Sequence, residues 1–163
     1  MLTARGCWRI DSSIEAINCL TNDKNKKLFE DMKVMTPVEC EARAVVMHDH
    51  YTGTTEMEAL VLIDMINQHI IPSCKEASVG PITELHGCVQ ILKDEVAKIH
   101  AANTSYEKAT IARNLRLEIM VDIREHCDAA EAVVPSSMWT LATYSELLFL
   151  DQTDVGGEGG GMY

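Results

Sequence analysis

Thr36-Pro37-Val38-Glu39 is the sequence feature that most constrains the fold of this chain. The Thr36 hydroxyl can accept a hydrogen bond from the backbone N–H of Glu39, while the Glu39 carboxylate can accept one from the backbone of Thr36. Pro37 occupies the first helical position, where an N–H is not needed. The motif therefore predicts that a helix begins at this point.

The helix that this motif opens is predicted to be long. Helix-forming sequence continues to about Val79, a length of roughly 60 Å at 1.5 Å per residue. Gly53 and Pro72 lie inside it, and we expect them to bend the helix or to divide it in two. The stretch from Met57 to Ile66 is apolar on nearly every side. We therefore expect neighbouring elements to cover it on more than one face.

Shorter helical patterns flank this segment. Two lie between Asp11 and Lys33. A turn at Gly80-Pro81 precedes a helix with a coiled-coil seam of about two and a half heptads, formed by Ile82, Leu85, Val89, Leu92, Val96 and Ile99. A second capping box, Thr104 to Glu107, opens the next helix, which ends before Pro135 and carries an apolar stripe including Leu115, Ile123 and Cys127.

The short connection at Ala102 and Asn103 predicts an antiparallel hairpin of these two helices. A third capping box, Thr143 to Glu146, opens a brief apolar stretch. The predicted fold class is all-α: a long kinked helix packed with an antiparallel helical hairpin, with short flanking helices and a disordered glycine-rich tail. We expect residues 1–35 to form an N-terminal segment of short helices, 36–150 the helical domain, and 151–163 the acidic tail.

Charge and cysteine content limit the class of partner and compartment. The formal net charge is −11, so broad contact with nucleic acid or with anionic lipid is not expected. Six cysteines are scattered singly, without a C-x-x-C pair, which is typical of a reducing compartment. No apolar run reaches the roughly 18 residues that span a bilayer, and no secretion signal is evident. A soluble, intracellular protein is expected.

Histidine residues near carboxylates are candidate metal ligands. No glutamate has a histidine three residues later, so the ligand spacing of di-iron bundles is missing. His48-Asp49-His50 could hold an ion only if the helix broke there, because residues two apart on a helix point in roughly opposite directions. We expect solvated or capping histidines instead. The other histidines (His69, His86, His100 and His126) are single and are expected at surfaces or interfaces.

Nucleophilic, phosphate-binding and glycosylation motifs have simpler explanations. Cys127 adjoins His126, but neighbours on a helix diverge by about 100°, and Cys127 lies on an apolar stripe, so a buried thiol is expected. The glycines after residue 155 follow no strand and lack a Lys-Ser/Thr pair. Asn103-Thr104-Ser105 is a formal glycosylation sequon that is better explained as a helix start. No catalytic, cofactor-binding or metal-binding residue is predicted.

Charged residues within apolar helices are the remaining distinctive feature. Acidic residues lie in the long helix and arginines in the later one, and facing pairs could form salt bridges that fix the register of the helices. The residues concerned are Glu56, Glu58 and Asp64, and Arg113, Arg116 and Arg124.

Three ordered blocks of sequence resemble one family. They are Asn25-Lys26-Lys27-Leu28-Phe29-Glu30 leading to Thr36; a block with Glu41-Ala42-Arg43, Tyr51, Thr54-Thr55-Glu56-Met57-Glu58-Ala59, Asp64-Met65 and Ile70-Ile71-Pro72; and Trp139 followed by Thr143-Tyr144-Ser145-Glu146-Leu147-Leu148-Phe149. Together they are similar to the C-terminal end of type III glutamine synthetases, over about residues 14–149. Leu141-Ala142 replaces an expected proline, and the glycine-rich tail is not a family feature.

The resemblance implies a parent reaction in which ATP phosphorylates glutamate and ammonia displaces the phosphate, with Mg²⁺ or Mn²⁺ bound. It also implies stacked rings of subunits, with this chain contacting its own catalytic domain and neighbouring subunits. The family's catalytic motifs align with no position here, so we expect a fragment without activity of its own. The cytoplasm is the expected location, or a plastid in a photosynthetic eukaryote.

The alternative is a stand-alone helical interaction module whose seam from Ile82 to Ile99 pairs between molecules as a coiled coil. For subunit contacts within the family, the apolar segment from Met57 to Ile66 is the first candidate.

Overall fold

A computed structural model describes residues 10–149 of the chain, and these form helices, turns and loops without a β-strand. The chain begins with α1 (Ser13–Asn18), a 3₁₀ turn η2 (Cys19–Thr21) and α2 (Asp23–Asp31), which confirms the two short helical patterns. The all-α prediction is also confirmed. The predicted disordered tail at residues 151–163 lies outside the described residues.

The long helix begins where the capping box predicts. In α3 (Pro37–Met65), the Thr36 backbone N–H donates to Glu39 Oε2 at 2.7 Å, and the Glu39 N–H donates to Thr36 Oγ1 at 3.3 Å. The helix continues through a π-helical turn, η3 (Ile66–Ile70), into α4 (Ile71–Ala77). Its end at Ser78, in the left-handed conformation with φ 55°, agrees with the predicted length.

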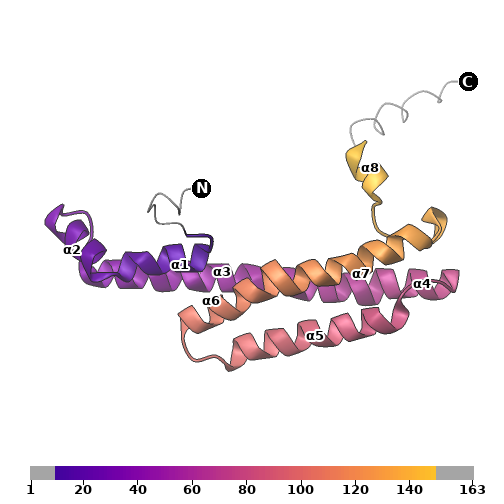
Figure 1. Ribbon diagram of the computed structural model, residues 1–163, viewed down its shortest axis with the longest axis horizontal. Coiled ribbons are helices and arrows are strands. Elements are labelled where there is room, and N and C mark those ends of the chain that lie inside the picture. Colours follow the sequence, from indigo (N-terminus) through magenta and orange to yellow (C-terminus); the bar gives the residue numbers. More distant parts are fainter. Residues whose placement is uncertain (1–9, 150–163) are drawn as a thin grey trace, which may run out of the picture. The chain divides into compact units, whose positions relative to one another are not determined.

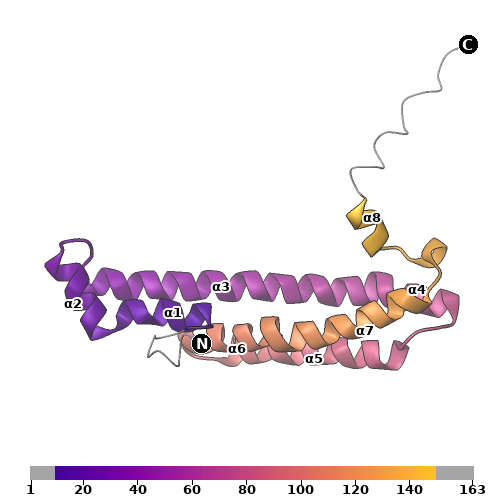
Figure 2. The ribbon, with the colours of Figure 1, turned by 45° about the horizontal axis from the view of Figure 1, so that its top comes forward.

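The two expected interruptions behave differently. Gly53 causes no break, because α3 is α-helical on both sides of it (Figure 2). One glycine costs a helix only about 0.5–1 kcal/mol relative to alanine, and the neighbouring Thr52 and Thr55 are buried. Pro72 does mark a change, since the π-helical turn ends two residues before it and Pro72 occupies the first turn of α4. A proline cannot donate the helical hydrogen bond, and a π-helical turn is one way of accommodating that loss.

The chain forms two compact units. Unit 1 comprises residues up to Leu62 together with Gln90–Asp122. In this unit α1 lies beside α3 in both views (Figures 1 and 2) and contacts α6 (Ser105–Asn114). Its buried apolar side chains include Ile14, Cys40, Ala44, Ala59, Leu92, Ile99, Ala109, Ala112 and Leu115.

Unit 2 comprises Ile63–Val89 and the described residues from Ile123 onward. It contains most of α7 (Met120–Val133), a 3₁₀ turn η5 (Ser136–Met138) that contacts α4, and α8 (Tyr144–Leu148). Gly80 closes the turn after α4 with φ 98°, and a Cβ there would lie 2.8 Å from Cys74 Sγ. The turn therefore requires glycine. The buried apolar residues include Ile66, Ile70, Cys74, Leu85, Cys88, Val89, Ile123 and Ala130.

The predicted hairpin is confirmed. Helix α5 (Ile82–Ala101) turns at residues 102–104 into α6, where Thr104 and Glu107 form the complete capping box. A π-helical turn, η4 (Leu115–Ile119), joins α6 to α7. Leu85 and Leu92 of the α5 seam have no exposed surface, so the seam packs within the chain. This contradicts the alternative in which the seam pairs between molecules.

The expected cover over the middle of α3 is wrong within this chain. Met57, Leu60 and Val61 are 60%, 48% and 52% exposed, whereas Ala59 in the same stretch has no exposed surface. The reason is geometric: α5 reaches one side of this stretch, where His100 Nε2 lies 2.7 Å from Glu56 Oε1, and no element within residues 10–149 covers the side that carries Met57 and Leu60.

Candidate interaction surface

The outer face of α3 is a surface with exposed apolar residues that unit 1 leaves open. We use this name for the side of the helix that carries Val46, His50, Gly53, Met57 and Leu60, which are all exposed. Val46 is 66% exposed. The opposite side of the helix is buried, as shown by Cys40, Ala44, His48, Thr52, Thr55 and Ala59. Helix α3 therefore carries apolar residues on both sides, mixed on the covered side with His48, Thr52 and Thr55.

A groove of about 460 Å³ runs along the edge of this face. Its walls are formed by Ile17 of α1, by Val46, Met47, His50, Tyr51 and Thr54 of α3, and by Arg116 of η4. The Arg116 guanidinium lies 5.9 Å from the centre of the Tyr51 ring, which is a cation–π distance. The groove thus has apolar walls and one cationic side chain at its border.

Arg116 is held in this position by a second contact. Its Nη2 atom donates to Glu58 Oε1 at 3.2 Å, so the predicted salt bridge between the long helix and the later one is present. Arg116 belongs to the π-helical turn η4, and such turns frequently occur at functional sites. The contact fixes η4 to α3 within unit 1.

The other charged residues that were candidates for these ion pairs do not pair between the long helix and the later one. Glu56 accepts a hydrogen bond from His100 Nε2 at 2.7 Å rather than from an arginine. Arg113 Nε is buried without a hydrogen-bond partner. Arg124 pairs with Asp128 at 3.5 Å. Arg116–Glu58 is thus the one predicted acidic–arginine pair found among residues 10–149.

The His48-Asp49-His50 cluster is split by the continuous helix. His48 is only 4% exposed and packs edge-on against Tyr106 of α6, with ring centres 5.6 Å apart. The expectation of a solvated His48 is therefore wrong, because it lies on the side of α3 that faces α6. His50 is exposed and lines the groove. Across residues 10–149, no group of three His, Cys, Asp or Glu side chains is placed to hold a metal.

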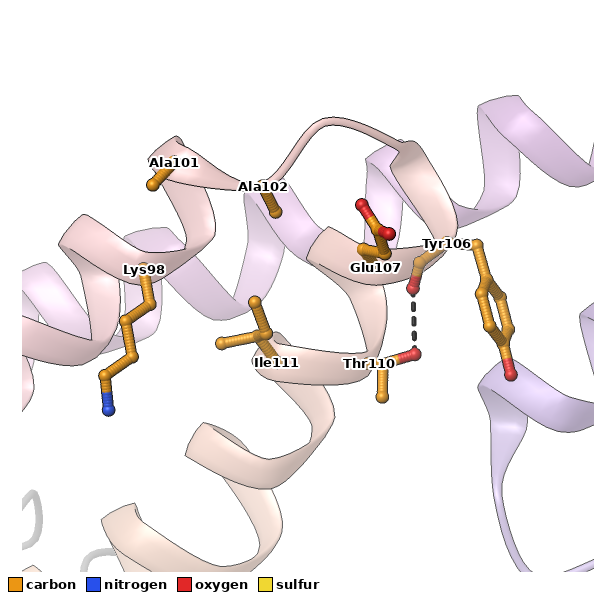
Figure 3. Close-up of a pocket in the computed structure, with 7 residues that line it drawn as sticks. All are labelled: Lys98, Ala101, Ala102, Tyr106, Glu107, Thr110 and Ile111. Carbon is orange, nitrogen blue, oxygen red and sulfur yellow. Dashed lines mark hydrogen bonds between the residues drawn. The ribbon is translucent and has the colours of Figure 1, made fainter.

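A second hollow, of about 520 Å³, lies at the α5–α6 turn. Figure 3 shows Lys98, Ala101 and Ala102 on one side and Glu107, Thr110 and Ile111 on the other. The Thr110 hydroxyl donates to the Tyr106 carbonyl at 2.8 Å, and Glu107 is occupied by the helix cap. No nucleophile is paired with a base among the residues that line this hollow.

Cys127 is a half-buried thiol, less covered than expected from its place on the apolar stripe. Burial raises its pKa to about 11, and the nearby Cys88, Asp128 and Cys74 act in the same direction. The thiol is therefore protonated at neutral pH, which disfavours nucleophilic attack because the thiolate is the reactive form. The raised pKa agrees with an unreactive thiol, although Cys127 is only partly buried.

Tyr144 links α8 to α7 within unit 2. The Tyr144 hydroxyl donates to Asp128 Oδ1 at 3.0 Å and accepts a hydrogen bond from Arg124, while its backbone N–H donates to Glu131 at 3.2 Å. Thr143 and Glu146 form the predicted capping box. This anchored helix exposes Leu147, Leu148 and Phe149. His69 contributes a nearby link, with its Nδ1 atom 3.0 Å from Thr140 Oγ1.

The sequence pointed to the correct stretch of α3 but not to its exposed side. The signal was present, because Val46, Gly53 and Leu60 are seven residues apart and therefore lie along one line of the helix. It was hidden because further apolar residues, such as Ala44, Ala59 and Val61, lie elsewhere around the same helix.

None of the helices within residues 10–149 combines the length and apolar character needed to cross a membrane.

Comparison with known proteins places this helical chain in a family. The family described as "Glutamine synthetase C-terminal domain" matches residues 3–86, more than half of the chain. A type-3 glutamine synthetase from Dictyostelium discoideum is 24% identical over 180 aligned positions, which cover 90% of this chain and 24% of that protein. The chain thus spans about a quarter of the length of this relative. It belongs to the glutamine synthetase C-terminal domain family.

Proposed function

We propose that this chain is the assembly domain of a type III glutamine synthetase. In this proposal it packs against the catalytic part and against neighbouring subunits of a ring-shaped oligomer. The catalytic part would ligate ammonia to glutamate at the expense of ATP, with Mg²⁺ or Mn²⁺ bound outside the present chain. The cytoplasm, or a plastid in a photosynthetic eukaryote, is the corresponding location.

The outer face of α3 carries this proposal. Large apolar side chains such as Val46 and Met57 lie exposed there, and contiguous apolar patches of this kind commonly mark protein–protein contacts. The groove bordered by Arg116 extends the same surface. A domain whose longest helix is apolar on its open side is suited to packing against other parts of an assembly.

The proposed lack of independent activity follows from the groups that the reaction requires. Phosphoryl transfer from ATP depends on side chains that hold metal ions and on groups that stabilise the phosphate charge. Residues 10–149 bring together no set of three side chains suited to a metal ion. The proposed role is therefore architectural.

A chimeric enzyme tests the assembly role. The chain would replace the segment it matches in the Dictyostelium type-3 enzyme, alongside a version that lacks the segment altogether. We expect the deletion to lose the high-mass oligomer and the chimera to regain it, as measured by light scattering after gel filtration. Leu60→Asp in the chimera should weaken assembly, with Ile91→Asp, at an exposed position of α5, as the matched control.

Activity is measured in parallel as γ-glutamyl hydroxamate formation with ATP and Mg²⁺ or Mn²⁺. The isolated chain should give none. Turnover by the chain alone would contradict the architectural role, and so would a deletion variant that assembles and works like the intact enzyme.

A further inference from the structure

The outer face of α3 has a regular spacing of residues that the elements within residues 10–149 leave exposed. Val46, His50, Gly53, Met57 and Leu60 follow one another in steps of four, three, four and three residues. This is the spacing of a helix that packs along another helix. All five residues are exposed, in contrast to the seam of α5. The spacing therefore predicts a partner helix beyond those that residues 10–149 supply.

The two outermost apolar residues of this face lie at equal distances from Gly53. Val46 lies seven residues before Gly53, and Leu60 lies seven residues after it. Two copies of α3 placed antiparallel with their Gly53 residues together would bring Val46 of each beside Leu60 of the other. The same step pattern extends to Arg43 before the seam and to Asp64 after it, so opposite charges also meet at both ends. Such an arrangement has two-fold symmetry, as most dimers do.

Nothing in the described surroundings of Gly53 requires a glycine. Its φ is not positive, since Gly80 is the one described glycine with a positive φ, and a Cβ at position 53 would meet nothing within 4 Å. A glycine inside a helix is less favourable than an alanine. What glycine uniquely permits is the close approach of another backbone. Its place at the centre of the seam is where two crossing helices would come nearest.

We propose that the outer face of α3 binds the same face of a second copy of this chain, antiparallel and crossing at Gly53. The proposal rests on the assembly role proposed above and specifies its partner. Charge supports the choice of surface: the chain has a formal charge of −11, so most surfaces of two copies repel, whereas this seam ends in one arginine and one aspartate. The contact from Val46 to Leu60 spans only about 21 Å, so the pair is weak alone and is reinforced by other contacts in an oligomer.

Cysteine cross-linking tests the pairing and its direction. The double variant V46C/L60C of the full chain should form disulfide-linked dimers on mild oxidation, at least fivefold more than either single variant or the native sequence. The two positions are about 21 Å apart within one chain, too far for an internal disulfide. A parallel pair would instead cross-link through V46C alone and through L60C alone. Cross-linking of the double variant at the native level overturns the proposal, as does the parallel result.

Substitution of the central glycine gives a second test. Gly53→Ala and Gly87→Ala are matched, because both positions are exposed on helices and neither has an atom within 4 Å of the added Cβ. Both should raise the midpoint temperature of unfolding of the chain. Only the change at position 53 should weaken self-association measured by sedimentation at high concentration, and Gly53→Leu should weaken it at least tenfold. Unchanged association of Gly53→Leu overturns the proposal.

The outcomes also separate this proposal from the assembly role. If Leu60→Asp disrupts the chimeric enzyme while V46C/L60C gives no cross-link above the native level, the outer face has another occupant and self-pairing is rejected. If the cross-links form but the deletion variant assembles normally, the pairing stands and the assembly role is rejected.

Discussion

Helices α5 and α3 each carry a row of residues with the same spacing, but the row on α5 is largely buried and the row on α3 is exposed. The seam of α5 is satisfied inside the chain, where Leu85 and Leu92 have no exposed surface. The outer face of α3 repeats the alternation of three and four residues but leaves Val46 and Met57 exposed. The difference shows that a helical repeat predicts that a partner exists, whereas only the structure shows whether the same chain supplies it.

The largest effect expected from this comparison is on folding stability. Leu92→Ala in the seam of α5 should reduce the free energy of unfolding by about 2–5 kcal/mol, because a fully buried leucine leaves a cavity. Leu60→Ala on the outer face should cost less than about 1 kcal/mol in the isolated chain, since Leu60 is 48% exposed. Urea unfolding followed by circular dichroism measures both.

Ile91→Ala is the control for these two changes, because Ile91 adjoins Leu92 but is 48% exposed. It should behave like Leu60→Ala. Equal losses for Leu92→Ala and Ile91→Ala would mean that the seam of α5 is not the buried one.

The second expected effect concerns the turn that brings α6 against α5. Thr104→Ala removes the hydroxyl that accepts from the Glu107 N–H at 3.2 Å, and it should cost about 1 kcal/mol. Thr104→Ser keeps the acceptor and should retain most of that stability. If Ser and Ala at position 104 are equally destabilising, the capping box does not stabilise the hairpin.

Much of this fold was predictable because its determinants are local. Each of the three capping boxes is complete within four residues. The turn after α4 is likewise marked by two adjacent residues, Gly80 and Pro81. His48 was not predictable, because its burial depends on Tyr106, which is distant in sequence. Likewise, the exposure of Met57 depends on where the other helices end, and the pairing of Glu56 with His100 depends on a residue 44 positions away. Interactions between distant elements decided each of these outcomes.

The third expected effect is a pH dependence of the α3 cap. Hydrogen bonds from the Thr36 backbone and side chain lower the pKa of Glu39 below its ordinary value of 4.5. A carboxylate with a lowered pKa stabilises the folded state at pH values above 4.5, and this contribution is lost as the pH falls through the pKa of the folded state. We expect the helical content near α3 to decrease over that range.

Glu39→Gln should remove this part of the pH dependence, and Glu146→Gln should do the same for α8, where Thr143 lowers the pKa of Glu146 in the same way. NMR titration of the two carboxyl groups provides the measurement. A Glu39 that titrates at or above 4.5 would show that the cap does not hold the carboxylate.

The smallest expected effect is that of the ion pair between Arg116 and Glu58. Both side chains are substantially exposed, at 42% and 35%, and exposed pairs contribute about 0.2–1 kcal/mol. A double-mutant cycle with Arg116→Gln and Glu58→Gln isolates the pairwise contribution from the contact of Arg116 with Tyr51. Raising the ionic strength should reduce the coupling, because salt screens exposed charges. A coupling energy that is large and insensitive to salt would indicate that the pair is buried in an assembly, which would extend the contact surface from the outer face of α3 to η4.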